Sequence, residues 1–127
     1  MSPSQIVNDF ITAVEQKDVD TAVALLSDDI RYENMPMDPI IGRDAVAATL
    51  RMFLEPASAV EWPVLRETVD GSCVMNERLD RFKIGDGWLE LPVAGVFEIT
   101  DGLITLWRDY FDMATYQRQM AELTGGD

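Results

Sequence analysis

Hydrophobic residues at the start of the chain recur at the spacing of a helix. Ser2 and Pro3 are typical of a helix start, and Gln5 is placed to complete a capping box. The apolar positions that follow at this spacing are Ile6, Val7, Phe10, Ile11 and Val14. The pattern predicts an amphipathic first helix whose apolar stripe faces a core.

A short second helix is predicted next. Asp18 or Asp20 caps it, and Asp28–Asp29 ends it. Its inner face consists of Ala22, Val23, Leu25 and Leu26. Residues 30–34 then alternate apolar or aromatic with charged side chains, which predicts a short strand.

A loop and a third helix complete this half of the chain. Residues 35–39 contain two prolines, and each proline restricts its own backbone and that of the preceding residue, so this segment is irregular. The pattern from Gly42 to Leu54 is helical, with Val46, Leu50 and Phe53 on one side.

Beyond Ser58 the pattern changes to a period of two. Turn signals at Gly71, at Gly85–Gly87 and at Asp101–Gly102 separate four antiparallel strands, over residues 60–69, 73–84, 88–100 and 103–111. Asp112 can cap a final helix through Leu123, and residues 124–127 should fray. We predict a single α+β domain over residues 1–127, a cone-shaped curved antiparallel sheet with helices over its concave face, which encloses a pocket.

Composition and charge narrow the classes of function. The chain has 127 residues, of which 47% are hydrophobic and 26% are charged, as in a packed globular domain. Ten Lys and Arg against 23 Asp and Glu give a net charge of −13, which repels phosphate backbones and anionic lipid surfaces. Nucleic acid and membranes are therefore not expected as partners.

Histidine is absent, which excludes catalytic sites that need Ser-His-Asp or Cys-His and metal sites that need histidine. Proton transfer must then use carboxylates, Tyr, Lys or the single thiol, Cys73. One cysteine cannot form an intramolecular disulfide, and residues 1–4 lack the basic and apolar regions of a secretion signal. These features predict a cytoplasmic location.

Strand alternation predicts which polar side chains share a face. In the strand 73–84, Arg78 and Asp80 are neighbours on one face, beside the apolar Phe82. In the last strand, Asp109 shares a face with Leu103, Thr105, Trp107 and Phe111. In the strand 30–34, Tyr32 and Asn34 share the face of Ile30. Taken singly, each feature has a structural alternative, because an Arg-x-Asp pair can be an ordinary ion pair and Asp109 can point outward while Arg108 and Tyr110 pack.

Five blocks together resemble the limonene-1,2-epoxide hydrolase family. They are Tyr32-Glu33-Asn34-Met35-Pro36, Gly42-Arg43-Asp44-Ala45-Val46, Glu77-Arg78-Leu79-Asp80, Gly95-Val96-Phe97 and Trp107-Arg108-Asp109-Tyr110-Phe111-Asp112. The resemblance runs from about Phe10 to Asp112. It implies a cone fold like that of nuclear transport factor, usually dimeric, and a one-step hydrolysis of epoxides to vicinal diols without a metal or organic cofactor. The family's catalytic set falls on Tyr32, Asn34, Arg78, Asp80 and Asp109, all of the same residue type.

These residues suit the reaction that the resemblance implies. We expect ionised Asp109 to accept a proton from a water molecule held by Tyr32 and Asn34, while protonated Asp80 donates to the epoxide oxygen. Arg78 between the two acids balances one negative charge, and keeping a proton on the other avoids a buried net charge. The apolar lining is expected to select a lipophilic, cyclic or terpenoid epoxide. It is predicted to consist of Ile11, Val14, Phe53, Phe82, Leu91, Val93, Trp107 and Phe111.

Two other functions fit the same pattern. An isomerase or polyketide-cyclase-like enzyme of this architecture would use Asp109 to remove a proton from carbon, with Asp80 or Tyr32 stabilising an enolate. A non-catalytic protein would bind a small apolar ligand and dimerise through the open face of its sheet. An arginine between two acids favours activation of water.

Overall fold

The computed structural model describes residues 1–125, which form four helices and seven strands. The helices are α1 (Pro3–Glu15), α2 (Val19–Val23), α3 (Arg43–Leu54) and α4 (Met113–Leu123). The strands are β1 (Leu26–Asn34), β2 (Ile40–Ile41), β3 (Ala59–Glu61), β4 (Val64–Asp70), β5 (Cys73–Ile84), β6 (Gly87–Thr100) and β7 (Leu103–Tyr110). Of the residues expected to fray, Thr124 and Gly125 form a turn after α4, and Gly126 and Asp127 lie outside the described residues.

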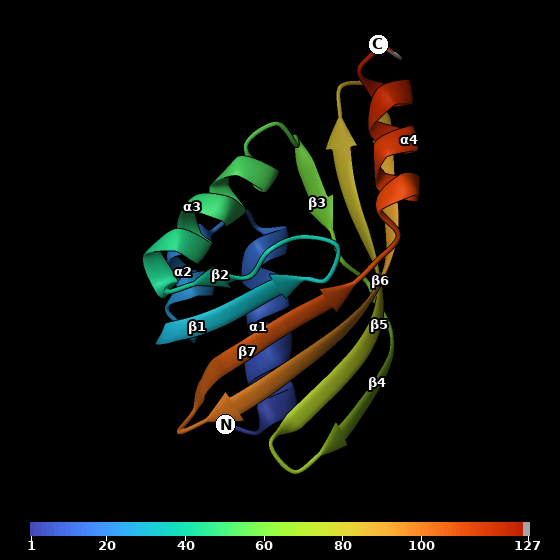
Figure 1. Cartoon of the computed structure of the whole chain (residues 1–127). Helices are drawn as coiled ribbons and strands as arrows, with labels where there is room; N and C mark the ends of the chain where they lie inside the picture. The colour runs from blue at the N-terminus through green and yellow to red at the C-terminus, as the bar shows by residue number, and fades with distance from the viewer. Residues whose placement is uncertain (126–127) are drawn as a thin grey trace.

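The strands form one curved sheet in the order β2-β1-β7-β6-β5-β3, with β4 also paired to β5 (Figure 1). Strands β4 to β7 make the antiparallel meander that the period-two pattern predicts. Strand β1 runs parallel to β7, so the sheet is mixed rather than antiparallel throughout. The predicted α+β class is confirmed.

Helix α1 covers the inner face of the sheet and lies behind it in Figure 1. The Ser2 hydroxyl accepts a hydrogen bond from the backbone N–H of Gln5 at 3.1 Å, as the predicted helix start requires. The buried side of α1 packs on the sheet through Phe10, whose ring meets Trp107 edge-on at a centroid distance of 5.0 Å. The core therefore lies between α1 and the middle of the sheet.

The first strand begins earlier than the periodicity predicts. Helix α2 ends at Val23 and β1 begins at Leu26, whereas the pattern predicts a helix as far as Asp28–Asp29 and a strand only from Ile30. Leu26 is fully buried and pairs in register with Ile104 of β7. Pairing with a distant strand outweighs local helix periodicity here.

The predicted strand 60–69 is two strands. Pro63 has no N–H to donate, and the chain breaks at Trp62 and Pro63 between β3 and β4, although both strands pair with β5. The break leaves Trp62 only 4% exposed, with its ring edge-on to Phe82 on the inner face of the sheet. The two-residue strand β2, which pairs with β1, was not predicted.

A β-bulge in β7 reverses the alternation near its start. It leaves Thr105 as an extra residue, so Ile104 is fully buried while Leu103 and Thr105 are partly exposed. The prediction that Leu103 and Thr105 share the inner face is therefore wrong. Beyond the bulge Trp107 and Asp109 are buried, as predicted.

Candidate active site

An arginine and two aspartates form a buried cluster on the inner face of the sheet. The Arg78 Nε and Nη2 atoms donate to the two carboxylate oxygens of Asp80, each at 3.0 Å. The same Nη2 atom donates to Asp109 Oδ2 at 2.9 Å. Arg78 is 1% exposed and each aspartate 4%. One guanidinium therefore joins both acids out of contact with bulk solvent.

Gly95 makes this arrangement possible. Strand β6 separates β5 from β7, and Gly95 lies in register between Asn76 and Asp109. A Cβ at Gly95 would lie 2.9 Å from Asn76 Oδ1 and 2.9 Å from Asp109 Oδ1, and it would be closest of all to Arg78 Nη1. The missing side chain thus lets Arg78 reach across β6 to Asp109.

Gly95→Ala is expected to destabilise the fold by about 1–3 kcal/mol, because the added methyl group overlaps a well-packed buried cluster. Chemical denaturation of the variant measures this loss. Ala24→Ser is a matched control at an exposed position after α2, away from the sheet, for which a change within about 0.5 kcal/mol is expected. Equal stability of Gly95→Ala and the wild type would contradict the close packing.

Tyr32 and Asn34 reach the cluster from β1. The parallel pairing sets Asn34 beside Asp109 and Tyr32 beside Trp107. The Tyr32 ring stacks on Trp107 with a centroid distance of 3.8 Å, and its hydroxyl donates to Asn34 Oδ1 at 3.1 Å. Both side chains are buried. All five residues predicted to be catalytic therefore lie in one place.

Burial sets the protonation of these groups. It raises the pKa of Asp80 to about 6 against the charge and hydrogen bonds of Arg78, which lower it, and the negative charges of Asp109 and Glu15 add smaller contributions to the rise. Burial and the charge of Asp109 raise the pKa of Tyr32 well above its usual value, so the phenol stays neutral. Burial acts to lower the pKa of Arg78, but Asp109 and Asp80 outweigh it and raise the pKa, so the guanidinium stays charged.

The two oxygens of Asp109 have different surroundings. Oδ2 accepts from Arg78, whereas Oδ1 is buried and has no hydrogen-bond donor among residues 1–125. A carboxylate oxygen with an unused lone pair is suited to accept a proton.

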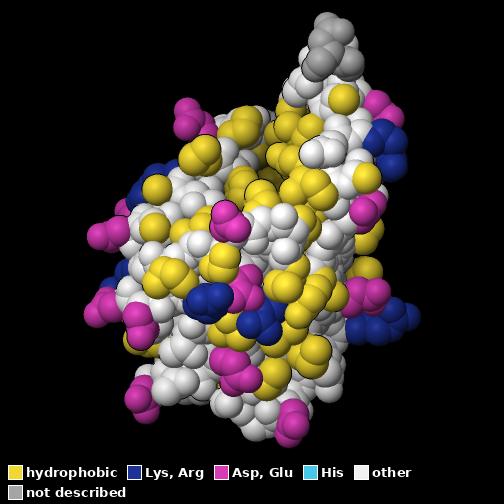
Figure 2. All heavy atoms as spheres, in the orientation of Figure 1, with side chains coloured by type: hydrophobic (Ala, Val, Ile, Leu, Met, Phe, Trp, Pro, Cys, Tyr) yellow, Lys and Arg dark blue, Asp and Glu magenta, His cyan; other side chains and the backbone are white. Residues whose placement is uncertain are grey.

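The cluster lies at the base of an apolar cavity of about 190 Å³. Figure 2 shows the corresponding hollow, lined by hydrophobic side chains, between the α3 and α4 sides of the molecule. Tyr32, Asn34, Asp80 and Asp109 line it. So do five of the eight predicted apolar residues, which are Phe53, Phe82, Leu91, Val93 and Phe111.

Three predicted lining residues do not reach the cavity. Ile11, Val14 and Trp107 are 4%, 0% and 0% exposed and belong to the hydrophobic core. Their inward orientation was inferred correctly, but α1 and the middle of the sheet fill the space between them. Strand and helix periodicity distinguishes inward-facing from outward-facing side chains, but it does not distinguish side chains that pack in the core from those that line a cavity.

Trp62 also lines the cavity, which was not predicted from the sequence. Its ring lies 5.1 Å from the centre of the Arg78 guanidinium, a cation–π distance. Its backbone N–H donates to Glu15 Oε2 at 2.8 Å. The proline after Trp62 was the available signal, because it marks a break that can turn a side chain out of alternation.

The rim of the cavity is rich in methionine and was also not predicted. It includes residues of the loop before β2, of α3 and of α4, namely Met37, Met52, Met113, Tyr116 and Met120. Flexible, polarisable methionine side chains adapt to ligands of different shape. Such a rim favours an apolar ligand.

Within residues 1–125, no three or more His, Cys, Asp or Glu side chains are grouped so that they could hold a metal ion. None of the helices in this range is long and apolar enough to cross a membrane.

Comparison with known proteins adds to this geometry. The family model described as limonene-1,2-epoxide hydrolase catalytic domain matches residues 1–122. Epoxide hydrolase EphG of Mycobacterium tuberculosis is 41% identical over 107 residues, which cover 84% of this chain and 71% of that protein.

Solved structures agree with the family and the fold. An LEH-like epoxide hydrolase from M. tuberculosis superimposes with a TM-score of 0.80 at 36% identity, over 97% of this chain and 95% of that one. A SnoaL-like polyketide cyclase homologue from Shewanella putrefaciens has a TM-score of 0.83 at 15% identity, over 94% and 96% of the two chains, which is a likeness of fold alone. The family match and the epoxide hydrolase relatives together show that the chain belongs to the limonene-1,2-epoxide hydrolase family and is an epoxide hydrolase.

Proposed function

We propose that this epoxide hydrolase adds water to a lipophilic cyclic or terpenoid epoxide, similar to limonene-1,2-epoxide, in one step without a covalent enzyme intermediate. The observation that carries the proposal is the hydrogen bonding of one buried guanidinium to both Asp80 and Asp109 at the base of an apolar cavity. Opening an epoxide near neutral pH needs a base for the attacking water and an acid for the departing oxygen.

Asp109, in its carboxylate form, is the base. Its carboxylate, which lines the cavity, accepts a proton from water, and the oxygen of that water forms a bond to an epoxide carbon. The Asn34 amide N–H donates to the water, since the Asn34 carbonyl oxygen already accepts from Tyr32. Tyr32 stays neutral and can accept the second water hydrogen through its phenol oxygen.

Asp80, in its protonated form, is the acid. As the carbon–oxygen bond of the epoxide breaks, Asp80 donates its proton to the leaving oxygen, which becomes the second hydroxyl of the diol. A proton passed from Asp109 back to Asp80 restores the starting state. Arg78 keeps the cluster neutral when one acid holds a proton, whereas two buried carboxylates would leave a net negative charge in the cavity.

Side chains supply both proton transfers, so the reaction needs neither a metal nor an organic cofactor. The apolar cavity and the methionine-rich rim support a lipophilic substrate. A net charge of −13 opposes binding to nucleic acid and to anionic membranes. A free thiol at Cys73 and the absence of a disulfide among the described residues fit a reducing, cytoplasmic compartment.

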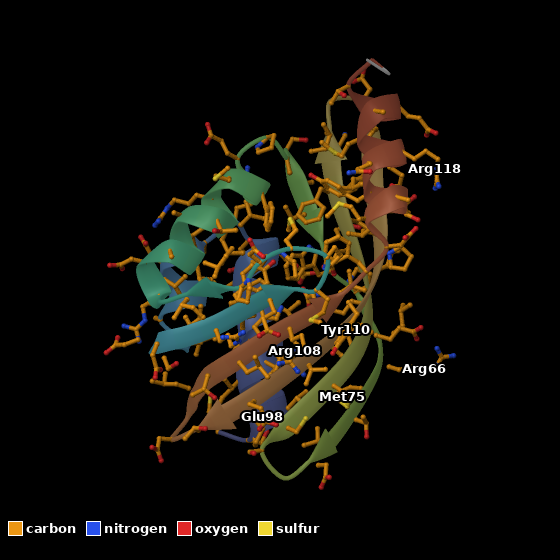
Figure 3. The ribbon with its side chains drawn as sticks, in the orientation of Figure 1. Arg66, Met75, Glu98, Arg108, Tyr110 and Arg118 are labelled. Carbon is orange, nitrogen blue, oxygen red and sulfur yellow. The ribbon has the colours of Figure 1, made fainter. Side chains whose placement is uncertain are left out.

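We also propose that the enzyme is a homodimer that uses the outer face of its sheet. Support comes from Met75 and Tyr110, which are 47% and 45% exposed on this face (Figure 3). Glu98 and Arg108 on the same face add charges of both signs, which a second copy of the same surface can match. A mass of 14.3 kDa, that of one chain, in analytical ultracentrifugation would contradict the dimer.

A single-turnover reaction in ¹⁸O-labelled water tests the proposed chemistry. Excess enzyme is mixed with limonene-1,2-epoxide and other cyclic epoxides, and the diol is analysed by mass spectrometry. We expect one labelled hydroxyl in the first turnover, because the attacking oxygen comes from solvent. An unlabelled diol in the first turnover would show that an enzyme carboxylate attacks instead, and the proposed mechanism would be wrong.

A further inference from the structure

Asn76 contacts the arginine of the active site without lining the cavity. It lies two residues before Arg78 on the inner face of β5 and is 5% exposed. Its Oδ1 atom accepts a hydrogen bond from Arg78 Nη1 at 3.0 Å. The proposed mechanism gives it no part in proton transfer.

The donors of Arg78 explain why an acceptor is needed at this point. The Nε and Nη2 atoms are used by the two acids, which leaves Nη1 at the third corner of the planar group. That corner lies over Gly95, where there is no side chain to hold it. Asn76 supplies the hydrogen bond, so all three nitrogens of the guanidinium have partners.

Asparagine suits position 76 because its side-chain oxygen accepts a hydrogen bond without carrying a charge. Arg78 already faces two acids, and a third carboxylate would add a negative charge to a site shielded from water. An asparagine oxygen orients the guanidinium without changing this balance. Its amide nitrogen, Nδ2, is buried and has no acceptor within residues 1–125, so the side chain is not optimised for stability.

We propose that Asn76 is a positioning residue that holds the Arg78 guanidinium in the orientation that serves both Asp80 and Asp109. This inference rests on the proposed acid–base mechanism. The charged groups that act on the pKa of Asp80 are Arg78 of β5, Asp109 of β7 and Glu15 of α1, and the neutral phenol of Tyr32 in β1 lies in the same cluster.

Two substitutions separate positioning from packing. Asn76→Leu removes the acceptor at similar volume and is expected to lower kcat at least tenfold, with KM changed less than about twofold, because substrate contacts remain while the acids lose their alignment. Asn76→Asp keeps an acceptor in the same place, so it should retain more of kcat than Asn76→Leu. Its added charge raises the pKa of Asp80, so the pH above which kcat/KM falls should move upward.

Val74→Ala is the matched control, since Val74 is buried on the same face two residues earlier and is outside the active site. It should lower the melting temperature and leave kcat within about twofold. Circular dichroism confirms that each variant is folded before its kinetics are measured.

The inference is overturned if folded Asn76→Leu loses less than tenfold in kcat, or if Asn76→Asp retains no more of kcat than Asn76→Leu and has an unshifted pH profile. The single-turnover reaction in ¹⁸O-labelled water and the activity of Asp109→Asn show whether only the role of Asn76 is wrong or the acid–base mechanism as well. If the diol carries solvent oxygen and Asp109→Asn is inactive, only the role of Asn76 is wrong. If Asp109→Asn remains active, the mechanism itself is wrong.

Discussion

Asp109→Asn and Asp80→Asn are each expected to lower kcat by about 10² to 10⁴, the usual size of one proton-transfer role. Asparagine preserves the shape of the side chain and cannot accept a proton at position 109 or donate one with carboxylic acid strength at position 80. Both residues are only 4% exposed, so bulk water does not readily replace their carboxyl groups.

Steady-state kinetics with a cyclic epoxide measures these losses. Asp86→Asn, in the exposed turn between β5 and β6, is the matched control and should keep wild-type kcat. A folded variant at position 80 or 109 with more than about a tenth of wild-type kcat would remove that residue from the mechanism.

Arg78→Lys is expected to lower kcat/KM by about 10² or more, although it keeps the positive charge. Lysine has one nitrogen where arginine has three, so it cannot reproduce two bonds to Asp80 together with one to Asp109. Misalignment of about 1 Å in a catalytic group is enough for a loss of this size.

Arg81→Lys is the control for this change. Arg81 forms ion pairs with Glu61 and Glu90 outside the cavity, and its replacement should leave kcat/KM within about twofold. Wild-type activity of Arg78→Lys would refute the requirement for one planar group between two acids.

The candidate catalytic cluster could be predicted from the sequence because alternation is reliable in long regular strands. Arg78 and Asp80 are two residues apart in a strand with regular alternation, and Tyr32 and Asn34 repeat this spacing in β1. Alternation also gave the inner position of Asp109, because the β-bulge of β7 precedes it. The family resemblance then selected these five residues from the other polar side chains.

Features that depend on contacts between residues far apart in the sequence could not be predicted in this way. The early start of β1 and its parallel pairing with β7 follow from contacts between Leu26 and Ile104, which are far apart in the sequence. Ile11 and Val14 were wrongly predicted to line the cavity. Periodicity gives the direction in which a side chain points, but not whether core atoms or a cavity lie next to it. Trp62 was missed because Pro63 interrupts the alternation that the prediction relied on.

The protonation of Asp80 tests the central claim most directly. With ¹³C-labelled aspartate, the NMR signal of the Asp80 carboxyl carbon can be assigned because it disappears in Asp80→Asn. Its chemical shift is then followed as the pH is raised. We expect its midpoint near the raised pKa of about 6, since burial favours the neutral form and the side chain keeps its hydrogen below that pH. A midpoint at the ordinary value of 3.8 would contradict the account, because Asp80 would then have no proton to donate.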